Sequence, residues 1–286
     1  MSVKFYPNYI FVAGFDAAAE PSITGETYAC SGGETTGPAY DLIDNRSTRV
    51  VTIDTNGQTT APVIDFDLLA NIASINFVII DNSNFNTANS DVGFSNKGST
   101  LDISSAYQGV RGSAMTACSI AGGTVADTSD DGSDGIILFV PETITDNGFE
   151  VNLIYDTVFA ADITIGEIAI GVSCITTYSA NARPLESYQY QGVDITQSLG
   201  GQKYATKRFG AQRAWRLTWD LITDTDKTNL EAMFDVVDGQ TYPLWVDFGD
   251  AATPKLHFVR FMQDRLDFQK QTHGVYTLTI DLQEEL

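Results

Sequence analysis

The stretch ADTSDDGSDG at residues 126–135 gathers oxygen-bearing side chains at spacings that could hold a metal ion. Asp127, Ser129 and Asp131, followed by Gly132, match the first half of a calcium-binding loop. Such a loop also needs a bidentate glutamate at its twelfth position, which here is Leu138. We therefore interpret the stretch as a solvated turn, keep weak calcium binding as the alternative, and assign no metal ligand.

The histidines and cysteines do not fall into catalytic or metal-binding patterns. His257 lies in an alternating strand and His273 precedes a glycine in an expected hairpin turn, so we interpret both as structural. Cys30, Cys118 and Cys174 are far apart, which favours buried thiols. The sequence also contains no GxSxG elbow, Walker-type loop or GxGxxG loop between a strand and a helix. We expect no enzyme activity, no catalytic residue and no cofactor.

The charge is unevenly distributed along the chain. The net charge is −21, and most of it lies in residues 1–178. An acidic surface repels phosphate backbones, which argues against sequence-specific nucleic-acid binding. No apolar run approaches the ~20 residues that cross a bilayer, so membrane insertion is not expected. Between Ile195 and Trp219 the chain has basic residues and no acidic one. These bases form the candidate subunit interface: Lys203, Lys207, Arg208, Arg213 and Arg216.

Residues 1–178 have the pattern of a β-sandwich. Short segments rich in Val, Ile and Phe alternate with loops of Gly, Ser, Asn, Thr and Asp. A helical turn is a further expectation for residues 100–108. The expected strands are 9–14, 50–54, 62–66, 75–81, 136–140, 149–155 and 163–175.

The last 80 or so residues predict a strand followed by a helix. In the strand at 212–221, Trp215, Leu217, Trp219 and Leu221 alternate with polar residues and should share one face. A capping box of Thr223 and Asp226 and a stop at Gly239 predict a helix at about 224–238, whose apolar stripe contains Leu230, Met233, Phe234 and Val237. The stripe should pack against the tryptophan strand. The expected core residues are Trp215, Trp219, Leu230, Phe234 and Trp245.

A polar segment separates these two regions. Residues 176–205 are rich in tyrosine, are punctuated by Pro184 and Gly200-Gly201, and predict a linker that merges into an extended arm. Together with the change in charge, this segment divides the chain into domains at 1–178 and 179–286. The expected fold class is all-β, with two β-sandwich domains and one helix packed against the second.

Residues 39–85 resemble the opening of a discoidin-type, galactose-binding-like β-sandwich. The matching positions are Leu42-Ile43-Asp44, Thr48-Arg49 and Val63-Ile64-Asp65-Phe66, and residues 161–174 are similar to the closing strand of that fold. Domains of this kind frequently bind glycans or membranes through loops at one end. The resemblance implies a jelly-roll sandwich over residues 1–178 and assigns no glycan-binding residue.

Residues 180–286 resemble tailed-phage distal tail proteins. The family pattern is an R-x-W-x-L strand, a helix, a G…YP-LWxD segment, a VRF…LDF segment and a C-terminal LxEx. The matching residues are Arg213, Trp215, Leu217, Gly239, Tyr242, Pro243, Leu244, Trp245, Asp247, Val259, Arg260, Phe261, Leu266, Asp267, Phe268, Leu282 and Glu284. Proteins of this family share the tail-tube fold and assemble into hexameric rings that join the tail tube to the baseplate.

The resemblance implies a structural virion protein that assembles in the host cytoplasm. Its expected partners are identical subunits in a ring, the tail tube and other tail-tip proteins. Residues 186–216 are expected to form an arm that bridges subunits, with its bases paired to a neighbour's carboxylates. The alternative is a carbohydrate-binding adhesion module whose partner is a host glycan.

Overall fold

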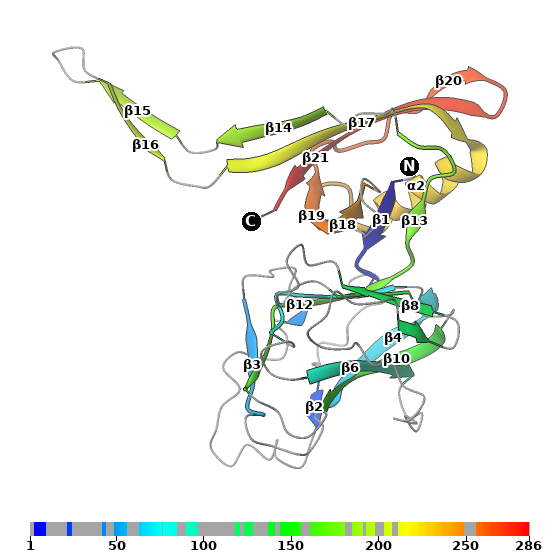
Figure 1. Cartoon of the computed structure of the whole chain (residues 1–286). Helices are drawn as coiled ribbons and strands as arrows, with labels where there is room; N and C mark the ends of the chain where they lie inside the picture. The colour runs from blue at the N-terminus through cyan, green and yellow to red at the C-terminus, as the bar shows by residue number, and fades with distance from the viewer. Residues whose placement is uncertain are drawn as a thin grey trace. The chain divides into compact units, whose positions relative to one another are not determined.

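The computed structural model divides into two compact units. Unit 1 contains Met1–Phe5, Cys174–Phe248 and His257–Leu286, and unit 2 contains Tyr6–Ser173 and Gly249–Leu256. The chain is described over residues 3–9, 22–24, 42–43, 49–55, 63–75, 77–84, 90–96, 118–120, 123–127, 137–140, 144–155, 161–180, 185–190, 193–197, 203–207, 211–248 and 256–285. Within these residues the structure is strand-rich, with one α-helix, which confirms the all-β class (Figure 1).

The units differ from the predicted ranges 1–178 and 179–286 at their edges. Strand β1 (Lys4–Pro7) enters the sheet of unit 1, where Lys4 and Phe5 pair with Ile175 and Cys174 of β13 (Cys174–Ile175). The start of the chain therefore belongs with its C-terminal part. The predicted strand at 9–14 lies, apart from Tyr9, outside the described residues.

Unit 2 is built from antiparallel sheets. One has the strand order β2-β4-β10-β6, another has the order β12-β5-β9-β8-β7, and β11 pairs with β3. The bounds are β2 (Ser22–Thr24), β3 (Val51–Ile53), β4 (Val63–Ile75), β5 (Phe77–Asp81), β6 (Ser90–Asn96), β7 (Cys118–Ile120), β8 (Gly123–Asp127), β9 (Ile137–Val140), β10 (Ile144–Tyr155), β11 (Ile163–Ile165) and β12 (Glu167–Gly171). These strands confirm the predicted segments at 50–54, 62–66, 75–81, 136–140 and 149–155.

The centre of unit 2 is the ladder between β5 and β12. The run of four apolar residues that starts at Phe77 is fully buried, and so are the residues of β12 opposite it. A strand that is apolar at consecutive positions is covered on both faces, which explains the continuous hydrophobic pattern. The predicted strand at 163–175 is divided into β11, β12 and β13, because Gly166 and residues 172–173 interrupt it.

Unit 1 contains an eight-stranded sheet and a helix. The strand order is β13-β1-β18-β19-β21-β17-β14, and β20 pairs with β21. The remaining bounds are β14 (Leu185–Tyr190), β17 (Ala211–Thr223), β18 (Leu244–Asp247), β19 (Leu256–Phe261), β20 (Gln269–Thr272) and β21 (Val275–Glu284). His273 and Gly274 form the two-residue turn between β20 and β21, as expected, and Gly274 has a φ of 72°. Glycine adopts this backbone conformation without steric penalty.

Helix α2 (Asp224–Val236) confirms the predicted helix. The Thr223 hydroxyl accepts a hydrogen bond from the Asp226 backbone N–H, and the Asp226 carboxylate accepts one from the Thr223 N–H, which completes the capping box. Gly239, with a φ of 64°, donates its N–H to the Phe234 carbonyl and ends the helix. Leu230 and Met233 are buried in one cluster with the tryptophan strand.

The tryptophan strand departs from the predicted alternation at its end. Trp215, Leu217 and Trp219 are buried, but Leu221 is 40% exposed and Ile222 takes the buried place. The β17–β21 register shifts between Trp219 and Ile222. A bulge adds one residue to a strand and moves the following side chains to the opposite face. The prediction that Leu221 lies on the tryptophan face is therefore wrong.

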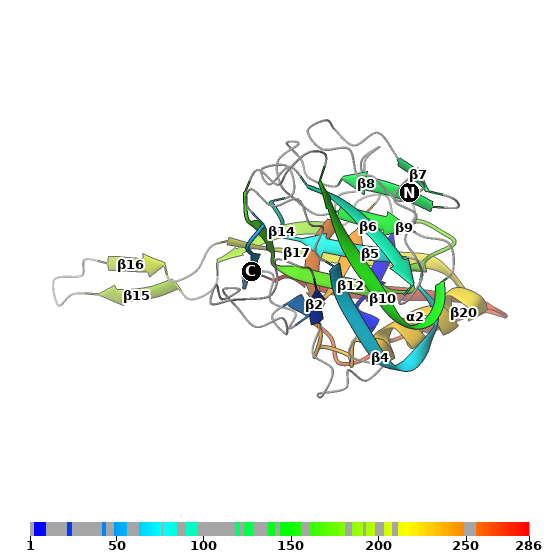
Figure 2. The same cartoon turned by 90° about the horizontal axis from the view of Figure 1, so that it is seen from below.

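The segment predicted as a linker contains regular structure. Strand β14 pairs with β17, and β15 (Val193–Gln197) pairs with β16 (Lys203–Lys207) in a separate two-stranded ribbon. Because β15 and β16 lie between β14 and β17 in sequence, the two ladders form nested hairpins. Figure 2 shows the two strands of the ribbon side by side without a third described strand along either of them.

Candidate functional site

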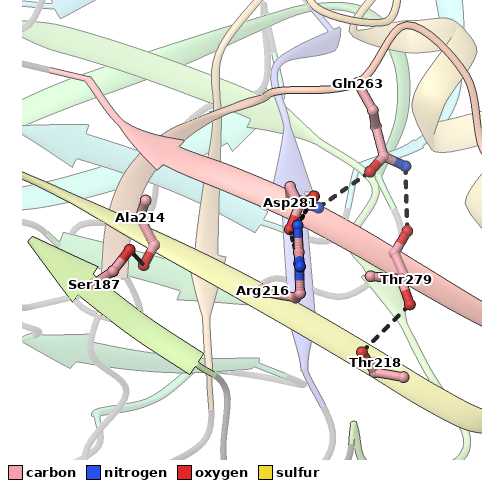
Figure 3. Close-up of polar contacts among 7 residues, drawn as sticks. All are labelled: Ser187, Ala214, Arg216, Thr218, Gln263, Thr279 and Asp281. Atoms are coloured by element: carbon pink, nitrogen blue, oxygen red, sulfur yellow. Dashed lines mark hydrogen bonds and ion pairs between the residues drawn. The ribbon is translucent and has the colours of Figure 1, made fainter. Parts of the chain in front are cut away.

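The functional candidate in unit 1 is the face of the β14–β17–β21 ladder opposite the buried tryptophans. Residues directly opposite each other in an antiparallel ladder share a face. The register pairs Ser187 with Ala214, Arg216 with Asp281 and Thr218 with Thr279 (Figure 3). We call this surface, together with the residues after β19 that line its depressions, the outer face. It consists of Ser187, Ala214, Arg216, Thr218, Asp220, Leu221, Met262, Gln263, Asp264, Arg265, Asp267, Thr279 and Asp281.

An ion pair lies at the centre of the outer face. Arg216 donates from Nε to Asp281 Oδ1 at 2.6 Å and from Nη2 to Oδ2 at 2.9 Å. The side-chain hydrogen bond with Asp281, followed by the charge of that carboxylate, raises the pKa of Arg216. A bidentate guanidinium–carboxylate pair fixes the orientation of both side chains, even where exposure limits its contribution to stability.

Hydrogen bonds extend this order along the face. Gln263 accepts from the Asp281 backbone N–H at 3.1 Å and donates to the Thr279 carbonyl at 3.4 Å (Figure 3). The hydroxyls of Thr218 and Thr279 lie 3.3 Å apart, and Ser187 donates to the Ala214 carbonyl at 3.4 Å. The outer face thus presents a fixed set of polar groups.

The outer face also carries carboxylates without an ion-pair partner among the described residues, and exposed apolar side chains. Asp220 and Asp264 are exposed and form no ion pair with any residue in the described part of the chain. Both line a shallow depression of about 500 Å³, together with the Arg265–Asp267 ion pair. The apolar side chains of Leu221 and Met262 are 40% and 50% exposed. The surface therefore combines free carboxylates with exposed apolar groups.

Arg213 lies on the buried side of the same strand and already has a partner. Its Nε and Nη2 donate to Glu284 Oε1 at 2.9 and 2.6 Å, and its backbone N–H donates to Oε2 at 2.9 Å. Its guanidinium lies 5.4 Å from the centre of the Trp215 ring. Burial raises the pKa of Glu284, but the hydrogen bonds from Arg213 outweigh it and lower the pKa overall.

Two of the predicted interface residues have ion-pair partners within the chain, and the interface itself stays a prediction. Arg213 and Arg216 were expected to need a neighbouring subunit's carboxylates, but Glu284 and Asp281 of the same chain supply them. Lys203 and Lys207 lie at the two ends of β16. Arg208 lies outside the described residues.

The structure brings four of the five predicted core residues together in one cluster. Trp215, Trp219 and Leu230 are buried in one cluster, and Phe234 packs against it at the edge, half-buried. The Phe234 ring meets Phe261 edge-on at 5.1 Å. Trp245 is also buried, and its ring centre lies 4.4 Å from that of Phe258.

Asp226 has a second role that the capping box did not reveal. Its Oδ1 accepts hydrogen bonds from the backbone N–H and the hydroxyl of Thr177, at 3.0 and 2.8 Å. Burial raises the pKa of Asp226, but the bonds from Thr177 and Thr223 outweigh it, so the pKa is lowered. Burial, reinforced by the charge of Asp226, raises the pKa of the Cys174 thiol to about 12. The carboxylate therefore ties the chain after β13 to the start of α2.

The remaining chemical candidates show packing contacts. The His257 ring lies 5.1 Å from Trp215 and 5.2 Å from Phe248, between ring centres. Among the described residues, no three His, Cys, Asp or Glu side chains are grouped as a metal site, and no helix is long and apolar enough to cross a bilayer. Asp127 ends β8 and Leu138 lies in β9, whereas the intervening calcium-loop positions and residues 100–108 fall outside the described part.

Comparisons with known proteins gave one structural likeness to report. No protein-family model matches the chain, and no curated protein matches it. A solved structure of the carbohydrate-binding module CBM32-1, from a family 31 glycoside hydrolase of Clostridium perfringens, is similar with a TM-score of 0.32 and 11% sequence identity. The likeness covers 55% of this chain and 100% of that module.

Proposed function

We propose that the chain is a ring-forming structural subunit of a phage tail tip, assembled in the host cytoplasm and carried in the virion. The proposal rests on the resemblance of residues 180–286 to distal tail proteins and on the architecture of unit 1. The resemblance segments fall on regular elements, since the R-x-W-x-L residues lie in β17 and the LWxD residues in β18. The proposed partners are identical subunits, the tail tube and other tail-tip proteins.

The observation that carries this proposal is the β15–β16 ribbon. It has two strands of five residues each and, within the described residues, no third strand. An isolated two-stranded hairpin is marginally stable in water and needs packing against another surface. A contact between the ribbon and a neighbouring subunit supplies that packing. Because the two contacting surfaces differ, repetition of the contact closes a ring or extends a filament.

The test is the mass and shape of the purified full-length chain. Light scattering after size-exclusion chromatography should show an oligomer whose population grows with protein concentration, and negative-stain electron microscopy should show closed rings, expected to be sixfold. A chain that stays monomeric at every concentration up to its solubility limit would contradict the proposal.

Carbohydrate binding by unit 2 is the second candidate function. It is favoured by the positions of the discoidin-like motif, because Val63-Ile64-Asp65-Phe66 opens β4 and the following apolar run forms β5. The partner would be a host-surface glycan. Incubation of the full-length chain with a glycan array should give saturable binding to a defined sugar class. The absence of binding at protein concentrations in the high micromolar range would reject this candidate and leave the assembly proposal unaffected.

A further inference from the structure

The β15–β16 ladder has two chemically different faces. Lys203 pairs with Gln197, Ala205 with Ile195 and Lys207 with Val193. Paired positions share a face and positions two apart along a strand share it as well, so these six positions belong to one face. That face combines three apolar positions with two lysines. We call it the lysine face of the ribbon.

The outer face of unit 1 offers the complementary chemistry. Asp220 and Asp264 are exposed, form no ion pair within the described residues, and line the same depression. Leu221 follows Asp220 in sequence and Met262 precedes Gln263, and both apolar side chains are exposed. Arg216 pairs with Asp281, and Arg265, which lines the same depression, pairs with Asp267, so Asp220 and Asp264 carry the uncompensated charge of this surface.

We infer that the lysine face of the ribbon docks on the outer face of a second copy of this chain. Lys203 and Lys207 would meet Asp220 and Asp264, and the apolar positions of the ribbon would cover Leu221 and Met262. This inference rests on the proposed assembly function and names the surface that receives the arm. A contact between opposite charges selects the partner and its register.

Chain geometry separates Lys207 from Asp220 of its own chain. Lys207 is four residues before Ala211, the first residue of β17, and Asp220 is nine residues after it. Four residues of fully extended chain span at most about 14 Å. Nine residues of strand span about 30 Å. Lys207 therefore cannot reach Asp220 of its own chain, whereas a second copy meets no such restriction.

Charge-reversal variants of the full-length chain test the inference. The arm variant is K203E/K207E and the face variant is D220K/D264K. The matched controls are K270E on β20 and D235K on α2, which reverse exposed charges outside both surfaces. Circular dichroism and thermal melting verify that each variant folds, and mass photometry with light scattering measures assembly at low and moderate salt.

The inference predicts a specific pattern of loss and rescue. Each reversed variant should need at least about tenfold more protein for half-assembly than the wild type, because attraction becomes repulsion at two sites. The controls should assemble like the wild type. An equimolar mixture of the arm and face variants should assemble again, because each reversed arm then finds a reversed face. The chain that carries all four substitutions should also assemble.

The outcomes separate this inference from the proposed function. If the wild type assembles and the arm variant or the face variant assembles equally well, the inference is wrong and the assembly proposal stands. If both variants lose assembly but neither the mixture nor the fourfold variant restores it, the two surfaces do not meet and the inference is again wrong. A wild type that never assembles overturns both.

Discussion

Phe5 is the residue through which the start of the chain should stabilise the C-terminal sheet. It lies in β1 between β13 and β18 and is fully buried. Its ring centre is 6.3 Å from that of Trp219 and 6.5 Å from that of Phe261. The predicted domain 179–286 contains neither β1 nor β13, yet Phe5 of β1 packs in the core of unit 1. We therefore expect the Phe5→Ala variant to destabilise unit 1 selectively.

The magnitude follows from burial. Truncation of a fully buried phenylalanine to alanine typically costs about 3–5 kcal/mol, since both transfer energy and packing are lost. The two aromatic neighbours place the expected loss in the upper part of that range. For a domain of about one hundred residues, each kcal/mol lowers the melting temperature by about 4 °C or more. The transition of unit 1 should therefore fall by at least about 12 °C.

Differential scanning calorimetry combined with hydrogen exchange on the full-length chain measures this effect. Peptides of β17 and α2 should lose protection in the Phe5→Ala variant, whereas peptides of β5 and β12 should keep theirs. Phe77→Ala is the matched control, because Phe77 is equally buried but belongs to unit 2 and meets Tyr6 edge-on at 5.1 Å. A loss below about 1 kcal/mol for Phe5→Ala, or equal deprotection of both units, would refute the reasoning.

Three further changes test unit 1. Phe234→Ala should destabilise unit 1 by about 1–3 kcal/mol in chemical denaturation. This is less than the loss on truncating a fully buried phenylalanine, because Phe234 is half-buried. A loss above about 4 kcal/mol would contradict this. Asp226 has a lowered pKa in the folded state, so its stabilisation is complete above about pH 4 and disappears as the pH falls further. Asp226→Asn should lower the free energy of unfolding by about 1–2 kcal/mol at pH 7 and flatten its dependence on acid pH in urea melts. An unchanged pH dependence would exclude the role of the carboxylate. In a C30S/C118S background, Cys174 should resist a thiol reagent at pH 8 until unit 1 unfolds, because burial raises its pKa to about 12; rapid labelling of the native chain would contradict that burial.

Local signals in the sequence were sufficient for α2. Each signal acts over only a few residues: the Thr223–Asp226 capping box, the apolar stripe and Gly239. Both the capping box and the hydrogen bond from Gly239 form as predicted. The alternation of β17 was reliable up to Trp219 for the same reason. It failed at Leu221 because a bulge depends on the register with β21, which lies far away in sequence.

The pairing of strands that are far apart in the chain could not be predicted from the sequence. Nothing in the residues around Phe5 indicates that β1 lies between β13 and β18, since a short apolar strand fits a sheet of either unit. The predicted linker failed differently. The polar, tyrosine-rich residues 185–207 have little apolar periodicity, yet they form two ladders because nested hairpins satisfy their backbone groups.

Strand pairing between distant segments also changes the interpretation of the basic residues between Ile195 and Trp219. A count of charges between Ile195 and Trp219 treats five bases as equivalent, but two of them meet acids that are 71 and 65 residues away in sequence, at Glu284 and Asp281. Antiparallel pairing of β17 with β21 brings these groups together. A neighbouring subunit therefore does not need to neutralise the strand, and its carboxylates can act on the ribbon, where Lys203 and Lys207 share a face. Assembly should accordingly weaken with salt as expected for a few exposed ion pairs, while the internal arginine pairs keep β17 and β21 in register.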